Sequence, residues 1–426
     1  MHFFLKEKKN RDFFRLWLGQ IISQFGDRIN QMALIGLIAS RTPGSAVELA
    51  KLLSFTIIPV FIVGPIAGVY VDRWDRRTTL FVCDFLRGLL VLTIPFIFMA
   101  WATMWPIYFV VLLIFSLSRF YVPAKMSIIP DIVQERDLLI ANSLVSVTGM
   151  IAFVLGCAMG GLIVEHFGSR GGFIADAITF FISGILVFSM RQKIRIKLST
   201  AKLIATGKEV ITVLRKSILE EFKEGIRYLT NHREIRLIIN TLFILFSAAG
   251  AIYVVIIVFV QEAFNSITRE LGLLAVFLGI GLFSGALIYG RWGKRLSPFK
   301  TMFLCLLLGG MLLLLFAFIV QNTRNFFAAA ALAFVLGLIV GPIIIAANTV
   351  VHQFSLEHMR GKVFSSLEII IHLAFLLAML ISSFLAEFIS RYLILMAVGT
   401  VFACIGFIGL WELRNNVRLL GGAAVR

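Results

Sequence analysis

The chain has 426 residues, of which 59% are hydrophobic and 15% charged, and its formal net charge is +17. No soluble core can bury so large an apolar fraction, so the composition excludes a soluble protein and makes lipid the solvent. The positive charge does not indicate nucleic acid, because in a membrane protein the position of Lys and Arg matters more than their sum.

Apolar runs of about 20 residues recur along the chain, and each is long enough to cross about 30 Å of hydrocarbon at about 1.5 Å per residue. We therefore predict an all-α membrane protein with twelve transmembrane helices. The predicted spans are residues 13 to 39, 48 to 71, 78 to 100, 105 to 128, 143 to 164, 172 to 190, 236 to 260, 271 to 290, 299 to 320, 326 to 347, 363 to 386 and 392 to 411.

A basic hydrophilic stretch divides the spans into two groups of six. We predict a first six-helix bundle over residues 1–190, a cytoplasmic linker over 191–235, and a second bundle with a cytoplasmic tail over 236–426. Apolar residues at spacings of three or four between Val210 and Leu229 predict an amphipathic helix in the linker, lying on the inner leaflet.

The basic residues mark the cytoplasmic side. With both termini on one side, that side holds 30 of the 40 Lys and Arg, and the opposite side holds 6. Loops rich in Lys and Arg face the cytoplasm, so both termini are expected there. The first residues lack the pattern of a cleaved signal peptide. The four cysteines fall inside predicted spans without metal-ligand spacing, so we expect packing roles and no metal or cofactor.

A charged motif follows the second span. It consists of Gly68, three residues, Asp72 and Arg73, two residues, and the pair Arg76 and Arg77. A glycine-containing end followed by a short basic turn recurs after the eighth span, at residues 285–295. Two halves that repeat each other, with the substrate between them at mid-membrane, are typical of secondary carriers.

This motif resembles the signature of the major facilitator superfamily, in the loop between its second and third helices. The resemblance implies two pseudo-symmetric six-helix bundles and a conformational gate, formed here by Gly68, Asp72, Arg73, Arg76 and Arg77 with Arg360 near helix 11. In the family the glycine lets helices 2 and 11 approach, and the aspartate faces the N-terminus of helix 11, where a carboxylate is favoured.

Further segments are similar to the branch with macrolide-efflux and enterobactin-exporter proteins. They include residues 15–20 with Gly26 and Asp27, residues 123–133, and residues 224–229. The resemblance implies a multi-pass protein of the bacterial cytoplasmic (inner) membrane, working as a monomer. Gly156, Gly160 and Gly161 resemble the antiporter signature of helix 5, with Cys157 in place of its proline; the alternative is generic helix packing by small residues.

Asp27 is the carboxylate expected deepest in the membrane, roughly 20 Å along the first helix. The polar residues around it include Gln24, Arg28, Asn30 and Gln31. Such a helix must face protein or water, and helix 1 lines the cavity in the resembling family. We expect Asp27 to change protonation or to bind a cationic substrate group; the alternative is a hydrogen-bonded tie to a neighbouring helix.

Other charges within the spans have competing interpretations. Arg119 on helix 4 is a proton-release candidate or a partner of Asp84, whereas Asp84 and Arg87, three residues apart, are expected to neutralise each other structurally. Asp176 is expected to reach water near the outer end of helix 6.

Glu368 and His372 lie four apart on helix 11, where they form either a second proton site or a packed hydrogen-bonded pair.

The leading hypothesis is a secondary active transporter. It would be a proton-coupled exporter that moves a hydrophobic or amphipathic small molecule, such as a drug or siderophore-like compound, by alternating access. A lysophospholipid flippase or metal-ion exporter on the same fold is the alternative. A membrane receptor or enzyme is a third reading, disfavoured because the sequence has no phosphate-binding loop, metal-ligand cluster or soluble catalytic domain.

Overall fold

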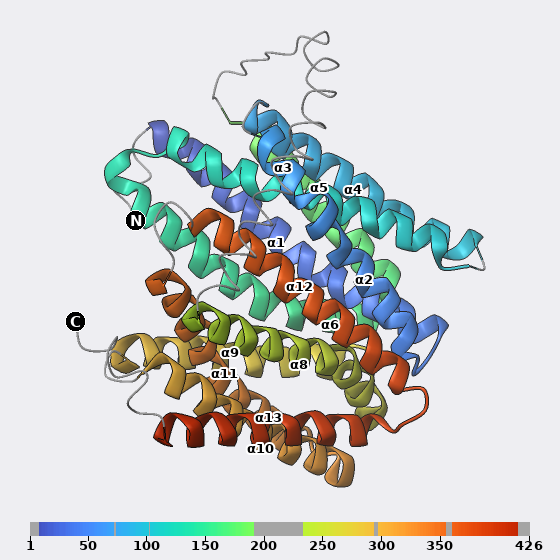
Figure 1. The fold of residues 1–426 in the computed structure, drawn as a ribbon. Coiled ribbons are helices and arrows are strands. Elements are labelled where there is room, and N and C mark those ends of the chain that lie inside the picture. The colour runs from blue at the N-terminus through green and yellow to red at the C-terminus, as the bar shows by residue number, and fades with distance from the viewer. Residues whose placement is uncertain are drawn as a thin grey trace. The chain divides into compact units, whose positions relative to one another are not determined.

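The computed structural model describes residues 8–71, 74–101, 103–190, 233–293, 297–354 and 360–415, and these segments are helical apart from short connections. They fall into two compact units (Figure 1). The first unit lies within Met1–Ser40 and Lys51–Glu221, and the second within Arg41–Ala50 and Phe222–Arg426. The predicted linker helix lies outside the described residues, as do Asp72 and Arg73.

Helices of the first unit follow the predicted spans. They are α1 (Lys8–Arg41), α2 (Ala46–Ile62), α3 (Gly64–Val71), α4 (Arg76–Ala100), α5 (Trp105–Ile132) and α6 (Leu138–Phe188), with a short 3-10 turn at Glu135–Asp137. Helix α6 is interrupted at Gly168, whose φ of 68° is readily adopted by glycine but strained for other residues. The break separates the two spans predicted at 143 to 164 and 172 to 190.

The described residues of the second unit form six long helices. They are α8 (Arg233–Phe264), α9 (Arg269–Trp292), α10 (Pro298–Thr323), α11 (Phe326–Phe354), α12 (Arg360–Leu385) and α13 (Arg391–Asn415). Pro298 opens α10, where its missing N–H costs nothing. Asn325 begins α11 by accepting hydrogen bonds from the backbone N–H groups of Phe327 and Ala328.

Nine stretches of the described residues are long and apolar enough to cross a membrane, and one of them, Glu135–Phe188, spans the break at Gly168. The first predicted spans are missing from this set. Helix α1 carries a polar series that includes Gln20, Asp27 and Asn30, and α2 ends after 17 residues, close to a turn at Val63. The structure is thus an all-helical membrane protein.

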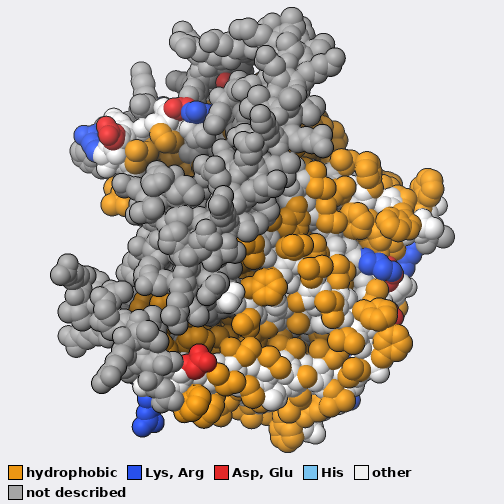
Figure 2. Space-filling view, viewed as in Figure 1, with side chains coloured by type: hydrophobic (Ala, Val, Ile, Leu, Met, Phe, Trp, Pro, Cys, Tyr) orange, Lys and Arg blue, Asp and Glu red, His pale blue; other side chains and the backbone are white. Residues whose placement is uncertain are grey.

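Polarity in these helices is the reverse of that in a soluble bundle. On α4, Asp84 and Arg87 are buried, whereas Val82, Phe85 and Leu89 are exposed. Hydrophobic side chains cover most of the described surface on the face shown in Figure 2. A helix with apolar residues outside and charges inside is stable when lipid surrounds it.

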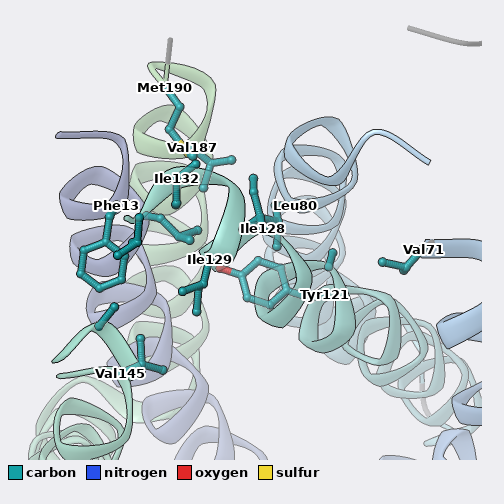
Figure 3. Packing of buried hydrophobic residues seen from close by; sticks show 14 of the residues in the cluster. Phe13, Val71, Leu80, Tyr121, Ile128, Ile129, Ile132, Val145, Val187 and Met190 are labelled. Atoms are coloured by element: carbon teal, nitrogen blue, oxygen red, sulfur yellow. The ribbon is translucent and has the colours of Figure 1, made fainter. Parts of the chain in front are cut away.

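A cluster of buried hydrophobic residues in the first unit joins helices α1, α3, α4, α5 and α6 (Figure 3). Phe13, Leu80, Ile128 and Val187 from four different helices are each at most 1% exposed. This apolar cluster ends at Tyr121, whose hydroxyl-bearing ring marks the transition to a polar region deeper in the unit.

Small residues set the spacing of helices in the second unit. A Cβ added at Gly281 or Gly285 of α9 would overlap the carbonyl oxygens of Phe334 or Leu338 on α11. Gly337 and Gly341 of α11 meet α9 in the same way. The backbones therefore touch along a seam, as expected where packing rather than hydrophobicity drives helix association.

The loop between α1 and α2 belongs to the second unit. Arg391, at the start of α13, donates to the carbonyl oxygen of Gly44 at 2.6 Å and pairs with Glu262 at 3.2 Å. Gly44 has a φ of 75°, which favours glycine.

Candidate functional site

A buried ion pair occupies the middle of α4. Arg87 and Asp84, one turn apart, are 3% and 0% exposed, and an Nη2–H of Arg87 donates to Asp84 Oδ1. The other oxygen of Asp84 accepts from the Ser183 hydroxyl on α6 at 2.7 Å. The expected pair is present, and it binds α4 to α6.

Two aromatic rings enclose the guanidinium. The centre of the Arg87 guanidinium lies 4.5 Å from the Tyr121 ring of α5 and 4.3 Å from the Phe180 ring of α6. Both distances are within the range of cation–π attraction, which strengthens when the groups are withdrawn from water. Arg87 is therefore held in position by three side chains from three helices, those of Asp84, Tyr121 and Phe180.

Asp27 approaches the same guanidinium from α1. Its Oδ1 lies 4.0 Å from Nη1 of Arg87, and its side chain is 43% exposed. The structure thus brings Asp27, which was predicted to be functional, close to the Asp84–Arg87 pair, which was predicted to be structural. A half-exposed carboxylate in the middle of a span must face protein or a water-filled space, because lipid would leave its charge unsolvated.

The remaining polar residues of α1 point in several directions. Arg28 donates to Gln31 at 3.0 Å, and its guanidinium lies 4.8 Å from the Phe153 ring. Gln24 faces Gly149 of α6, and Asn30 is buried. Arg119 is half-buried on α5, two residues before Tyr121. The guanidinium that contacts Asp27 is that of Arg87.

Asp176 corrects an expectation. Instead of reaching water, it is 0% exposed. The hydroxyl of Thr179, one turn further along α6, donates to its carboxyl group at 3.4 Å. The signal that indicates this position is a stripe on α6: Asp176, Thr179, Phe180 and Ser183 follow the spacing of one helix face.

Lys125 is a further buried charge, which the sequence analysis did not single out. It lies inside α5, within the span predicted at 105 to 128, and is 8% exposed. Its ammonium group adds a positive charge that acts on Asp27. The polar region therefore contains three carboxylates, those of Asp27, Asp84 and Asp176, together with Arg87 and Lys125.

Glu368 and His372 do not form the expected side-chain pair. His372 Nδ1 makes a 2.8 Å hydrogen bond with the main-chain oxygen of Glu368, on the preceding turn of α12, and the Glu368 side chain is exposed. A ring nitrogen bonded to a helix carbonyl is a local contact, and the second proton site at this pair stays a prediction.

The basic motif residues that are described hold the ends of three helices. Arg76 donates to Asp131 of α5 at 2.6 Å, and Arg77 donates to the main-chain oxygens of Val187 and Phe188 at the end of α6. Cations at a helix C-terminus satisfy its free carbonyls and favour its dipole. The backbone of Gly68 lies in α3 and Arg360 begins α12, but their side-chain environments lie outside the described residues.

The glycines of the antiporter-like segment pack against α1. A Cβ at Gly156 would lie 2.8 Å from Arg28 Cβ, and one at Gly160 would lie 2.9 Å from Ile29 Cα. Gly161 is buried beside them. This close approach places α1, which carries Asp27, directly against α6.

Comparison with known proteins identifies the family of this chain. Residues 8–356 match the major facilitator family described as transmembrane secretion effectors. The chain belongs to this family. As a major facilitator transporter of this family, it is a membrane transporter for small molecules, embedded in the lipid bilayer, and not an enzyme.

Relatives of this transmembrane secretion effector confirm the resemblance inferred from its motifs. It is 27% identical over 361 residues to the uncharacterized MFS-type transporter YkuC of Bacillus subtilis, covering 83% of this chain and 81% of YkuC. It is 23% identical over 417 residues to macrolide efflux protein A of Streptococcus pyogenes, covering 96% and 97%. A crystal structure of a POT family transporter in complex with thioalcohol-conjugated peptide has a TM-score of 0.69 at 13% identity, covering 98% and 97%, so the two share a fold.

Proposed function

We propose that the protein is a proton-coupled exporter of hydrophobic or amphipathic small molecules that works by alternating access. The observation that carries the proposal is Asp27, a half-exposed carboxylate in the middle of α1 whose Oδ1 lies 4.0 Å from Arg87. The family supports the transport reaction, and the similarity to macrolide efflux protein A supports the direction and the class of cargo. Protons are the proposed coupling ion, because a carboxylate is the simplest group that can bind and release one within a span.

The membrane arrangement belongs to the same proposal. It has twelve spans in two pseudo-symmetric bundles, residues 1–190 and 236–426, joined by the cytoplasmic segment 191–235. The pairing of α8 with α12, α9 with α11 and α10 with α13 in the second unit supports a six-helix bundle there. The protein is proposed to act as a monomer in the bacterial inner membrane with both termini in the cytoplasm, consistent with its distribution of Lys and Arg.

The proposed role of Asp27 depends on its interaction with the Arg87 guanidinium, which changes when the carboxyl group binds a proton. While the carboxyl group is ionised, the guanidinium 4.0 Å away favours its negative charge. When a proton binds, that attraction is lost and the pair can separate. A cationic or strongly dipolar substrate would compete with the proton for the same oxygens, so binding of one favours release of the other.

The motif arginines would control access from the cytoplasm. Arg76 and Arg77 bind the ends of α4, α5 and α6 together, which supports a rigid unit that moves as one body. Asp72 and Arg73, with Arg360, are proposed to form the contact that opens and closes.

Inside-out membrane vesicles test the function. Ethidium and erythromycin uptake is measured with and without an imposed pH gradient, for the native protein, Asp27→Asn and Glu387→Gln. The exposed Glu387, in the turn before α13, provides the matched control because it also loses one carboxylate. We expect gradient-driven uptake by the native protein and Glu387→Gln, and its loss in Asp27→Asn.

Two results would contradict the proposal. Undiminished uptake by Asp27→Asn would remove that residue from the coupling reaction. Transport of lysophospholipid or of a divalent metal, in vesicles that move neither ethidium nor erythromycin, would assign a different cargo to the same fold.

A further inference from the structure

The carboxyl group of Asp176 lies against the backbone of α1, one residue from Asp27. A Cβ at Gly26 would overlap both Asp176 Oδ1 and Thr179 Oγ1. Glycine at position 26 therefore makes the room in which α6 presents a carboxyl group and a hydroxyl to α1. Gly172, on the same part of α6 as Asp176, also meets α1 closely, because a Cβ there would lie 2.8 Å from Ala33 Cβ.

Asp176 has fewer partners than its burial requires. Its neighbours that donate hydrogen bonds are the Thr179 hydroxyl and the Asn30 amide, which are neutral groups. Asp176 Oδ2 is buried without a hydrogen-bond partner among the described residues, and so is Asn30 Oδ1. Two buried acceptors without donors are costly, and an ionised carboxylate in this position is more costly still.

Arg87 is already paired with the two other carboxylates. Arg87 donates to Asp84 and lies 4.0 Å from Asp27. The charged groups that act on Asp176 are Asp27 and Arg87, and those that act on Asp27 also include Arg28 and Lys125. Asp84, bonded to Arg87 and Ser183, has its charge matched directly. Among the described residues, Asp176 is the one of these three carboxylates without an ion pair to a cation.

We propose that Asp176 stores the coupling proton, and that Asp27 is the acid through which this proton enters and leaves. A proton on Asp176 removes the unmatched charge and converts an acceptor without a donor into a donor. In the transfer step the O–H bond at Asp176 breaks and one forms at Asp27, while the negative charge passes from Asp27 to Asp176. The inference rests on the proposed proton coupling and adds a second residue to it.

Infrared spectroscopy of the protein in liposomes tests the stored proton without any substrate. The native protein at neutral pH is expected to show the carbonyl stretch of a protonated, buried carboxylic acid. This band should disappear in Asp176→Asn, remain in Asp27→Asn and Glu387→Gln, and shift in frequency in Asp176→Glu. Persistence of the band in Asp176→Asn, or its loss in Asp27→Asn alone, would overturn the proposal. If Asp176→Asn does not fold, the Asp176→Glu variant decides instead, and a carbonyl band at the native frequency in that variant would overturn the proposal.

Transport measurements separate storage from binding. We expect Asp176→Asn to lose ethidium uptake driven by a pH gradient but to keep exchange of ethidium across the membrane, because exchange needs no net proton movement. Gradient-driven uptake at the native rate would exclude the role of Asp176. If the native protein moves neither ethidium nor erythromycin, the proposed function fails for these cargoes, while the infrared band still decides the protonation of Asp176.

Discussion

Arg87 is held in the middle of a membrane span, where an unpaired charge costs at least about 2.5 to 3.5 kcal/mol on insertion scales. Asp84 and Asp27 supply the negative charge, and Tyr121 and Phe180 supply two ring faces. Such an arrangement gains little net stability when complete, but removing one partner leaves a buried charge uncompensated.

Asp84→Asn is therefore expected to destabilise the protein strongly, by about 3 to 5 kcal/mol. The matched variant is Asp131→Asn, which breaks the exposed pair with Arg76 and should cost at most about 1 kcal/mol. Thermal unfolding of the two purified variants in one detergent measures the difference. Equal losses of stability in the two variants would show that breaking the Asp84–Arg87 pair leaves no uncompensated buried charge.

The sequence indicates part of this site. The spacing of Asp84 and Arg87 predicts their pairing, and depth along the helix selects Asp27. Their meeting at one guanidinium depends on how α1 packs against α4, which no local spacing records. Asp176 was misjudged because distance from a helix end was used as the measure of exposure, whereas the face that it occupies decides its burial.

Helix pairs in this protein are joined by small residues. The seam of α9 with α11 leaves no room for side chains at Gly281, Gly285, Gly337 or Gly341. Since lipid tails are as apolar as leucine, close backbone contact supplies the attraction between such helices.

Gly281→Ala is expected to lower stability by about 1 to 3 kcal/mol, because the added methyl group must push α11 away. Gly290 lies on the same helix α9, and a Cβ there meets nothing within 4 Å. Gly290→Ala should be neutral or stabilising by about 1 kcal/mol through helix propensity. Thermal unfolding compares the two variants. An unchanged stability of Gly281→Ala would mean that α9 and α11 can move apart without cost.

The spans of the apolar helices could be predicted from composition because each contains a long window with at most two charged residues. Helix α1 is different: it was predicted with the other apolar runs, at 13 to 39, but its residues are too polar to qualify as a span by hydropathy. The break at Gly168 agrees with two separate spans, although α6 continues on either side of it. The linker helix stays a prediction, since it lies outside the described residues.

At the scale of the molecule, hydrophobic side chains dominate the surface and Lys and Arg gather on the proposed cytoplasmic side. In the proposed arrangement this distribution predicts the orientation of every helix, because reversing one span would expose its loops to the wrong side. The two ends of α5, both bordered by exposed residues, provide a direct test of the orientation.

Cysteines at Thr103 and Glu135, on either side of α5, should react differently with a membrane-impermeant maleimide. We expect Thr103→Cys to be labelled in intact cells and Glu135→Cys only after permeabilisation. The background variant lacks the exposed Cys404, since the other three cysteines are buried. The opposite pattern would invert the proposed topology.

The second part of α6 has lipid-facing and protein-facing edges that cannot be exchanged. Ile174, Ile178 and Ile182 are between 40% and 51% exposed, whereas Asp176 and Ser183 are fully buried. Rotating this helical segment about its axis by one residue position, about 100°, would place a carboxyl group in hydrocarbon and an isoleucine in the polar interior. We expect its azimuth to stay fixed throughout the transport cycle, so that it can tilt or slide only together with α1.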